Sequence, residues 1–118
     1  MVNIKKLRKS FKQAFKGLKW TLKEQQNFRI QVSIAILVVL LAVVLRVKVI
    51  DFVILLILIL IVLILELINT AFERIVDILK PRIHQYAEII KDILAGCVLL
   101  ASMVAIIAGI LIFWPYIF

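Results

Sequence analysis

Apolar and polar positions divide the 118-residue chain into a mixed segment followed by three apolar ones. Residues 1–26 place apolar side chains at helical spacing and lysines on the other faces, which predicts an amphipathic helix lying in a membrane interface. Residues 28–45, 51–79 and 85–113 are apolar and long enough to cross a bilayer as helices. The pattern predicts an all-α integral membrane protein with an N-terminal amphipathic surface helix, three transmembrane helices and a single domain, 1–118.

The spacing between the apolar segments predicts how they connect. Residues 46–51 are so few that the first two spans must be antiparallel neighbours. A helix over residues 51–79 would measure about 43 Å, longer than the hydrocarbon core, so its last turns should extend into the cytoplasm. Pro81 is expected to end that helix, because proline cannot continue the hydrogen-bond ladder, and residues 80–85 are the predicted loop.

A polar stripe grows out of the second span. After 14 apolar residues, 52–65, come Glu66, Asn69, Glu73 and Asp77. At about 100° per residue, these side chains fall within about 80° of the helix circumference. Ionisable groups beside lipid are costly, so they usually pair, face a protein interior or do chemistry. The outermost members can equally be solvated charges at a helix end, whereas Glu66 and Asn69 fit that interpretation least.

Composition agrees with a membrane protein: 65% of the residues are hydrophobic and the mean hydropathy is +1.17. The net charge of +8 lies entirely within residues 1–29, where nine Lys or Arg accompany only Glu24. A basic block can bind nucleic acid, but beside membrane spans it indicates anionic lipid headgroups, so no nucleic-acid partner is expected.

Cys97 is the one cysteine, which excludes an internal disulfide; it is expected to be a packed small side chain. The first long apolar run begins only after Arg29, so no cleavable signal is expected.

The distribution of basic residues predicts the orientation. The N-terminal segment and residues 74–91 carry most of the positive charge, whereas the opposite side carries Arg46 and Lys48. The positive-inside rule then places the N-terminus and the polar stripe on the cytoplasmic side of a bacterial cytoplasmic membrane that the chain crosses several times. ATP and Mg²⁺ are available on that side.

The polar residues on the cytoplasmic side suit a magnesium–phosphate reaction. Mg²⁺ prefers oxygen ligands, a lysine can neutralise phosphate charge, and a carboxylate can accept a proton from an attacking hydroxyl. There is no glycine-rich phosphate loop, because the three glycines, Gly17, Gly96 and Gly109, are far apart. A proton or cation conductor is the competing interpretation, but residues 52–65 and 93–113 contain no charged side chain.

Several motifs together resemble one family. Residues 66–73 (ELINTAFE) with the later pair Lys91 and Asp92 resemble the signature of the small bacterial integral-membrane lipid kinases, the prokaryotic diacylglycerol kinases and undecaprenol kinases. Residues 15–18 (FKGL) and 27–30 (NFRI) also resemble N-terminal pieces of that family. The resemblance covers nearly the whole chain. It implies a homotrimer with composite active sites at the cytoplasmic membrane face, which transfer the γ-phosphoryl group of ATP to a lipid hydroxyl.

The resemblance also implies roles for individual residues. Glu66 would be the catalytic base at the lipid alcohol, and Asn69 would help order the catalytic and lipid-binding site. Glu73 would hold Mg²⁺ with its bound nucleotide. Lys91 would contact the nucleotide phosphates and Asp92 would lie near the adenosine.

Three further positions carry lesser expectations. Gly17 and its neighbours on the surface helix would help cover the nucleotide. Asp77 and His84 fall at family-like positions and are expected to have supporting roles only.

One position departs from the family pattern. The family usually has a Glu three residues before Phe28, where it joins the second-span Glu in binding metal; here that residue is Gln25, preceded by Glu24. We expect Glu24 or Gln25 to supply the second metal ligand and favour Glu24. The alternative is a non-catalytic or weakened kinase-fold scaffold protein. Residues 95–98 and 65–67 resemble the undecaprenol kinase branch more than the diacylglycerol branch, so undecaprenol is the first expected substrate and diacylglycerol the second.

Overall fold

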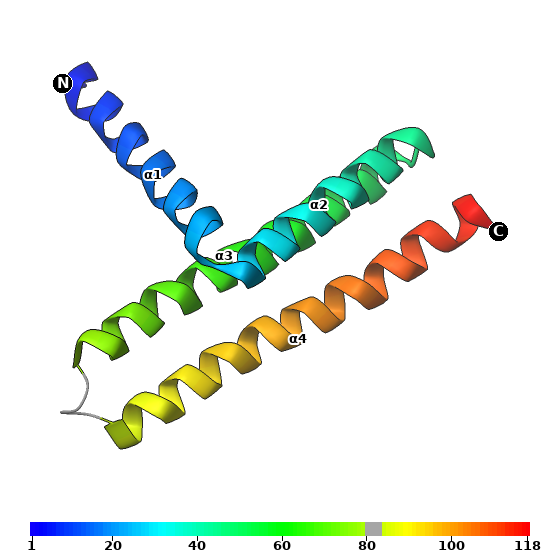
Figure 1. The fold of residues 1–118 in the computed structure, drawn as a ribbon. Coiled ribbons are helices and arrows are strands. Elements are labelled where there is room, and N and C mark those ends of the chain that lie inside the picture. Colours follow the sequence, from blue (N-terminus) through cyan, green and yellow to red (C-terminus); the bar gives the residue numbers. More distant parts are fainter. Residues whose placement is uncertain (80–83) are drawn as a thin grey trace.

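A computed structural model describes residues 1–79 and 84–118, apart from the side chain of His84. It contains α1 (Ile4–Glu24), α2 (Gln26–Val44), α3 (Val49–Leu79) and α4 (His84–Ile117), which confirms the predicted helical class. The expected stop at Pro81, most of the loop over residues 80–85 and the side-chain role of His84 lie outside the described residues. In Figure 1, α2 and α3 lie side by side, α4 runs along the bundle, and α1 points away from it.

A single non-helical residue joins the amphipathic helix to the first span. Gln25 has extended dihedral angles, φ −112° and ψ 111°, while its N–H still donates to the Thr21 carbonyl at 2.9 Å. From α2, the guanidinium of Arg29 donates to the carbonyls of Leu22 and Lys23 at 3.1 and 2.7 Å. A cation bound to the last carbonyls stabilises a helix end. Arg29 therefore caps α1 at the point where the chain changes direction.

The α2–α3 connection is a Schellman motif. The Arg46 N–H donates to the Val43 carbonyl and the Val47 N–H to the Ala42 carbonyl, both at 3.2 Å. Arg46 takes φ 53°, the left-handed conformation that this motif requires. The sequence prediction of a short turn between antiparallel helices is confirmed.

The described core lies beside this turn. Ala42 of α2, Leu55 of α3 and Phe113 of α4 are buried together, with Val47 packed against them.

The last helix, α4, continues to Ile117, beyond the predicted limit at residue 113, and includes Pro115. Proline in a last turn removes few helical hydrogen bonds, and the Phe118 N–H still donates to the Trp114 carbonyl at 2.9 Å.

Most apolar side chains outside this core are exposed. The helices Gln26–Val44, Val49–Leu79 and Gln85–Ile117 are long and apolar enough to cross a membrane, yet only 11, 17 and 6% of their most apolar windows are buried within the chain. Such surface must face lipid or another protein. The chain is therefore a multi-pass membrane protein. Cys97 is exposed on α4, so the prediction that its side chain is packed within the chain is wrong.

Candidate active site

The predicted polar stripe, Glu66, Asn69, Glu73 and Asp77, lies along one face of α3 and passes from buried to exposed. Glu66 and Asn69 are 3 and 7% exposed, Glu73 is half-buried, and Asp77 is exposed. Thr70, which directly follows Asn69 in the sequence, is also buried and is 4% exposed. The helical period thus places a buried carboxylate and a more accessible one, seven residues apart, on the same face.

Glu66 is held by a residue of another helix. The Gln31 Nε2 of α2 donates to Glu66 Oε2 at 3.4 Å. Burying a carboxylate costs free energy unless hydrogen bonds replace its water, and this bond is long. Glu66 therefore keeps capacity to accept a further hydrogen bond from a ligand.

Asn69 and Glu73 form the second pair of the stripe. Asn69 Nδ2 donates to Glu73 Oε1 at 3.3 Å, one helical turn away. Three buried polar atoms near the stripe have no hydrogen-bond partner among the described residues: Gln31 Oε1, Asn69 Oδ1 and Thr70 Oγ1. Each such atom costs about 1–3 kcal/mol when left unpaired. Their clustering around one carboxylate is typical of a place where a ligand or water supplies the missing partner.

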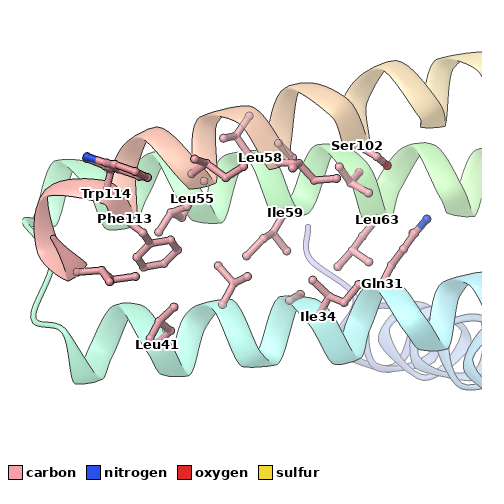
Figure 2. A pocket seen from close by; sticks show the side chains of 18 of the residues that line it. Gln31, Ile34, Leu41, Leu55, Leu58, Ile59, Leu63, Ser102, Phe113 and Trp114 are labelled. Atoms are coloured by element: carbon pink, nitrogen blue, oxygen red, sulfur yellow. The ribbon is translucent and has the colours of Figure 1, made fainter.

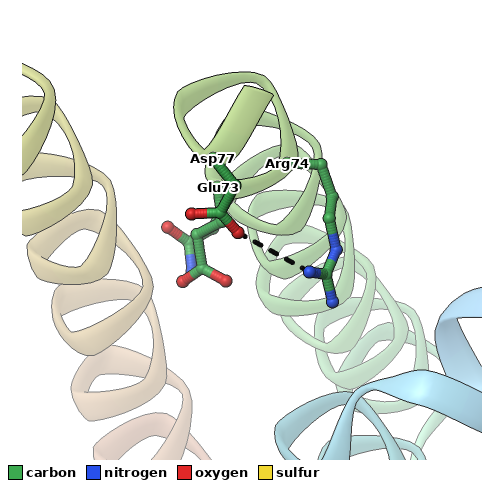
Figure 3. Close-up of polar contacts among 4 residues, drawn as sticks. Glu73, Arg74 and Asp77 are labelled. Atoms are coloured by element: carbon green, nitrogen blue, oxygen red, sulfur yellow. Dashed lines mark hydrogen bonds and ion pairs between the residues drawn. The ribbon is translucent and has the colours of Figure 1, made fainter. Parts of the chain in front are cut away.

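At its exposed end, the α3 helix is connected to α1. Arg74 Nη1 lies 3.6 Å from Asp77 Oδ2, and Figure 3 marks this ion pair with a dashed line. The Arg74 guanidinium also lies 5.3 Å from the centroid of the Trp20 ring on α1. Arg74 and Asp77 are each about half exposed, so the ion pair contributes little stability. The cation–π contact is the feature that links the surface helix to the stripe.

An apolar groove of about 550 Å³ runs between α2, α3 and α4 towards Glu66. Figure 2 shows Gln31 at one end, beside Ile34 and Leu63, and Phe113 and Trp114 at the other. Gln31 belongs both to this groove and to the hydrogen bond with Glu66. The groove therefore ends at Gln31, the hydrogen-bond partner of the buried Glu66 carboxylate.

The other predicted site residues make no polar contact with the stripe in the described parts of the chain. Glu24 is exposed at the end of α1, Gln25 forms the joint, and Lys91 is half-buried on α4 beside exposed Asp92. Within residues 1–79 and 84–118, none of these four donates to, accepts from or ion-pairs with the carboxylates of α3. Gly17 is exposed, and a Cβ added there would meet open space. Over the same ranges, no group of three His, Cys, Asp or Glu side chains is placed to hold a metal ion.

Sequence reasoning did not single out Gln31 or Thr70. An amide inside an apolar span needs a hydrogen-bond partner, so the position of Gln31 did indicate that such a partner exists. The partner could not be identified from the sequence, because it lies 35 residues away. Nothing in the local pattern around Thr70 distinguishes a buried hydroxyl from an exposed one.

Comparison with known proteins gives concordant matches. The family "Prokaryotic diacylglycerol kinase" matches residues 12–113. The chain is 37% identical over 101 residues to a protein of Synechocystis sp. named diacylglycerol kinase, covering 85% of this chain and 58% of that protein. It is 32% identical over 107 residues to a protein of Bacillus subtilis named undecaprenol kinase, covering 91% and 87% of the two chains.

The chain thus spans less than two thirds of the Synechocystis protein and most of the Bacillus one. The matched region includes the whole polar stripe, the first two apolar helices and the third as far as residue 113. The chain belongs to the prokaryotic diacylglycerol kinase family.

Proposed function

We propose that the protein is a lipid kinase that transfers the γ-phosphoryl group of ATP to the hydroxyl of a membrane lipid alcohol. The observation that carries the proposal is the position of Glu66, a buried carboxylate hydrogen-bonded to Gln31 at the end of an apolar groove. A lipid alcohol has the matching form, an apolar body with one hydroxyl. Membership of the family and the kinase names of both relatives support the same activity.

In this proposal Glu66 acts as the general base. The lipid hydroxyl donates to the Glu66 carboxylate, which removes its proton while the lipid oxygen attacks the γ-phosphorus. The new O–P bond forms as the bond from the γ-phosphorus to the ADP oxygen breaks. General base catalysis of this kind typically contributes a factor of about 10²–10⁴ in rate. The apolar surroundings exclude water, which would otherwise compete as acceptor of the phosphoryl group.

Glu73 and Asn69 fit a magnesium ion in the chemistry of their donor atoms. Glu73 supplies a carboxylate, and the unpaired Asn69 Oδ1 supplies a carbonyl oxygen one turn away. Mg²⁺ is usually held by one or two carboxylates together with substrate phosphates, so a set of three acidic side chains is not required. When bound, the ion would neutralise charge on the transferring phosphoryl group. Glu24 is our proposed second protein ligand, with Gln25 as the alternative.

The nucleotide contacts are proposed to come from the separated residues. Lys91 would neutralise the phosphates, Asp92 would lie near the adenosine, and Gly17 would let the surface helix approach the nucleotide. Within the described residues of one chain, these side chains make no hydrogen bond or ion pair with the stripe, and we propose a homotrimer in which neighbouring copies complete each site. The basic α1 is proposed to lie on the cytoplasmic face of a bacterial membrane, which sets the orientation of the active site.

Two lipid alcohols are proposed as substrates, undecaprenol first and diacylglycerol second. The Bacillus relative is named undecaprenol kinase and the Synechocystis relative is named diacylglycerol kinase. A second function is favoured by one observation: Gln25 stands where the family pattern has a carboxylate, and a neutral amide is the weaker metal ligand. The alternative is a non-catalytic or weakened kinase-fold scaffold in the membrane.

One assay separates these functions. The purified protein in lipid bilayers is given ATP, Mg²⁺ and either undecaprenol or diacylglycerol, and the lipid phosphate is measured. The kinase proposal expects product, with a loss of about 10²–10⁴ in turnover for Glu66→Gln and a smaller loss for Glu66→Asp, which keeps the base. Absence of product from every lipid alcohol would overturn the kinase proposal and favour the scaffold. Undiminished turnover in Glu66→Gln would refute the choice of base alone.

A further inference from the structure

Gln31 and Glu66 form a polar pair between two apolar helices. Gln31 lies on α2 and Glu66 on α3, 35 residues apart, and their hydrogen bond is at the end of the groove where Leu63 also lies. An amide placed there must find partners in the protein, because lipid offers none. The Gln31–Glu66 hydrogen bond is therefore a partly buried contact between two helices, and each side chain depends on the other for a partner.

The two functional atoms of the Gln31 amide are used unequally. Nε2 donates to Glu66 Oε2 at 3.4 Å, whereas Oε1 is buried and has no partner in the described parts of the chain. The other amide near Glu66, that of Asn69, already donates to Glu73. Asn69 Oδ1 and Thr70 Oγ1 are also unpaired there, but among these three residues Gln31 is the one whose side chain already bonds to Glu66 and still has a free acceptor.

We propose that Gln31 is a positioning residue that stabilises Glu66 in both of its protonation states. Before the transfer, Nε2–H donates to the Glu66 carboxylate and fixes its orientation. When the O–H bond of the lipid alcohol breaks and its proton moves to Glu66, the carboxyl group becomes a donor. The Gln31 amide then turns about its terminal torsion, which is soft and nearly two-fold, and Oε1 accepts from the new O–H. This inference rests on the proposed kinase function.

The physical need for such a partner comes from burial. A carboxyl group that changes charge away from water loses its hydration in one state or both. A fixed donor would stabilise the carboxylate only, and a fixed acceptor would stabilise the acid only. An amide offers either by rotation, and it adds no charge to the groove through which a lipid alcohol approaches.

Four variants test the inference in the bilayer assay. Gln31→Met keeps the length and apolar stem but removes both amide functions, so turnover should fall about 10- to 100-fold, the equivalent of one hydrogen bond to a charged group. The KM for ATP should not change, since Gln31 is not proposed to touch the nucleotide. Gln31→His, which can also donate or accept, should retain more turnover than Gln31→Met or Gln31→Glu. The matched control is Gln13→Met on the exposed face of α1, which should leave turnover unchanged.

A double-mutant test asks whether Gln31 acts through Glu66. In a Glu66→Gln background, Gln31→Met should cause no further loss of the residual turnover, because the group it positions is gone. An equal loss in both backgrounds, or full turnover in Gln31→Met, would overturn the inference while the kinase function stands.

An infrared measurement separates this inference from the activity itself. The difference spectrum between the wild type and Glu66→Gln isolates the Glu66 carboxyl band, which should shift in Gln31→Met but not in Gln13→Met. If the wild type phosphorylates no lipid, the proposed function fails and this band alone judges the pairing: a shifted band supports it and an unshifted band overturns it.

Discussion

Tyr116 and Asp51 join the end of the last helix to the start of α3. The Tyr116 hydroxyl donates to Asp51 Oδ2 at 2.8 Å and accepts from the Lys48 N–H at 2.9 Å. Lys48 immediately precedes α3, so its N–H is one of those that a helix start leaves without an internal partner. One hydroxyl therefore caps a helix and satisfies a carboxylate, although it comes from a residue 65 positions further along the sequence.

Replacing Tyr116 by Phe should lower stability. The substitution keeps the ring and removes both hydrogen bonds, one of them to a charged group, so we expect a loss of about 1–3 kcal/mol. The measurement is the midpoint of thermal unfolding in detergent micelles. Tyr86→Phe is the control, because Tyr86 is exposed. Equal midpoints for the two variants would show that the Tyr116 hydrogen bonds contribute nothing.

Replacing Arg46 by Gly should raise stability. Arg46 takes φ 53°, a conformation in which an L side chain costs about 1 kcal/mol and glycine costs almost nothing. Arg46→Ala serves as the control, since it removes the same charge but keeps the Cβ strain. We expect the unfolding midpoint to rise for Gly relative to Ala, and no difference between them would contradict the assignment of strain to this residue.

The contact between Trp20 and Arg74 should restrain the surface helix. A cation–π pair at an exposed position contributes about 0.5–1 kcal/mol, enough to shift a marginal docking equilibrium several-fold. A spin label placed by Ser10→Cys in a Cys97→Ser background reports the mobility of α1. Trp20→Leu should increase that mobility, whereas Trp114→Leu, at the far end of the bundle, should not. Unchanged line shapes in Trp20→Leu would exclude this role.

The joint between α1 and α2 should set the magnesium requirement, if the proposed kinase function holds. Gln25→Glu restores the family carboxylate and should lower the Mg²⁺ concentration for half-maximal activity, and Glu24→Gln should raise it, each by about tenfold. Magnesium titrations of the lipid phosphorylation rate measure both. An unchanged Mg²⁺ dependence in Glu24→Gln would reject Glu24 as a ligand.

Sequence patterns predicted the helices well because their signals are local. Apolar runs of membrane length, a 3.6-residue period and a short polar connection each specify a helix or a turn without reference to distant residues. The polar stripe was also predictable, since the residue spacing alone places Glu66, Asn69 and Glu73 on one face. The Schellman turn at Arg46 was not, because the residue that usually marks it is glycine.

Contacts between helices were the part that sequence did not reveal. The Gln31–Glu66 and Tyr116–Asp51 pairs join residues 35 and 65 positions apart, and no periodicity encodes which polar residue meets which. The Trp20–Arg74 contact likewise depends on the angle that Gln25 gives to α1. In the Gln31–Glu66 pair, a polar group in apolar surroundings indicated that a partner must exist, but not which residue it is.

The tight turn over Leu45–Lys48 bears on how the chain enters the membrane. With so few residues between them, α2 and α3 cannot insert independently; they must enter as one helical hairpin whose tip crosses the lipid. The tip carries Arg46 and Lys48 with Asp51 close behind. Because charged side chains are costly in lipid, we expect this tip to hinder insertion, and shortening or recharging the turn should impair insertion before it impairs the folded protein.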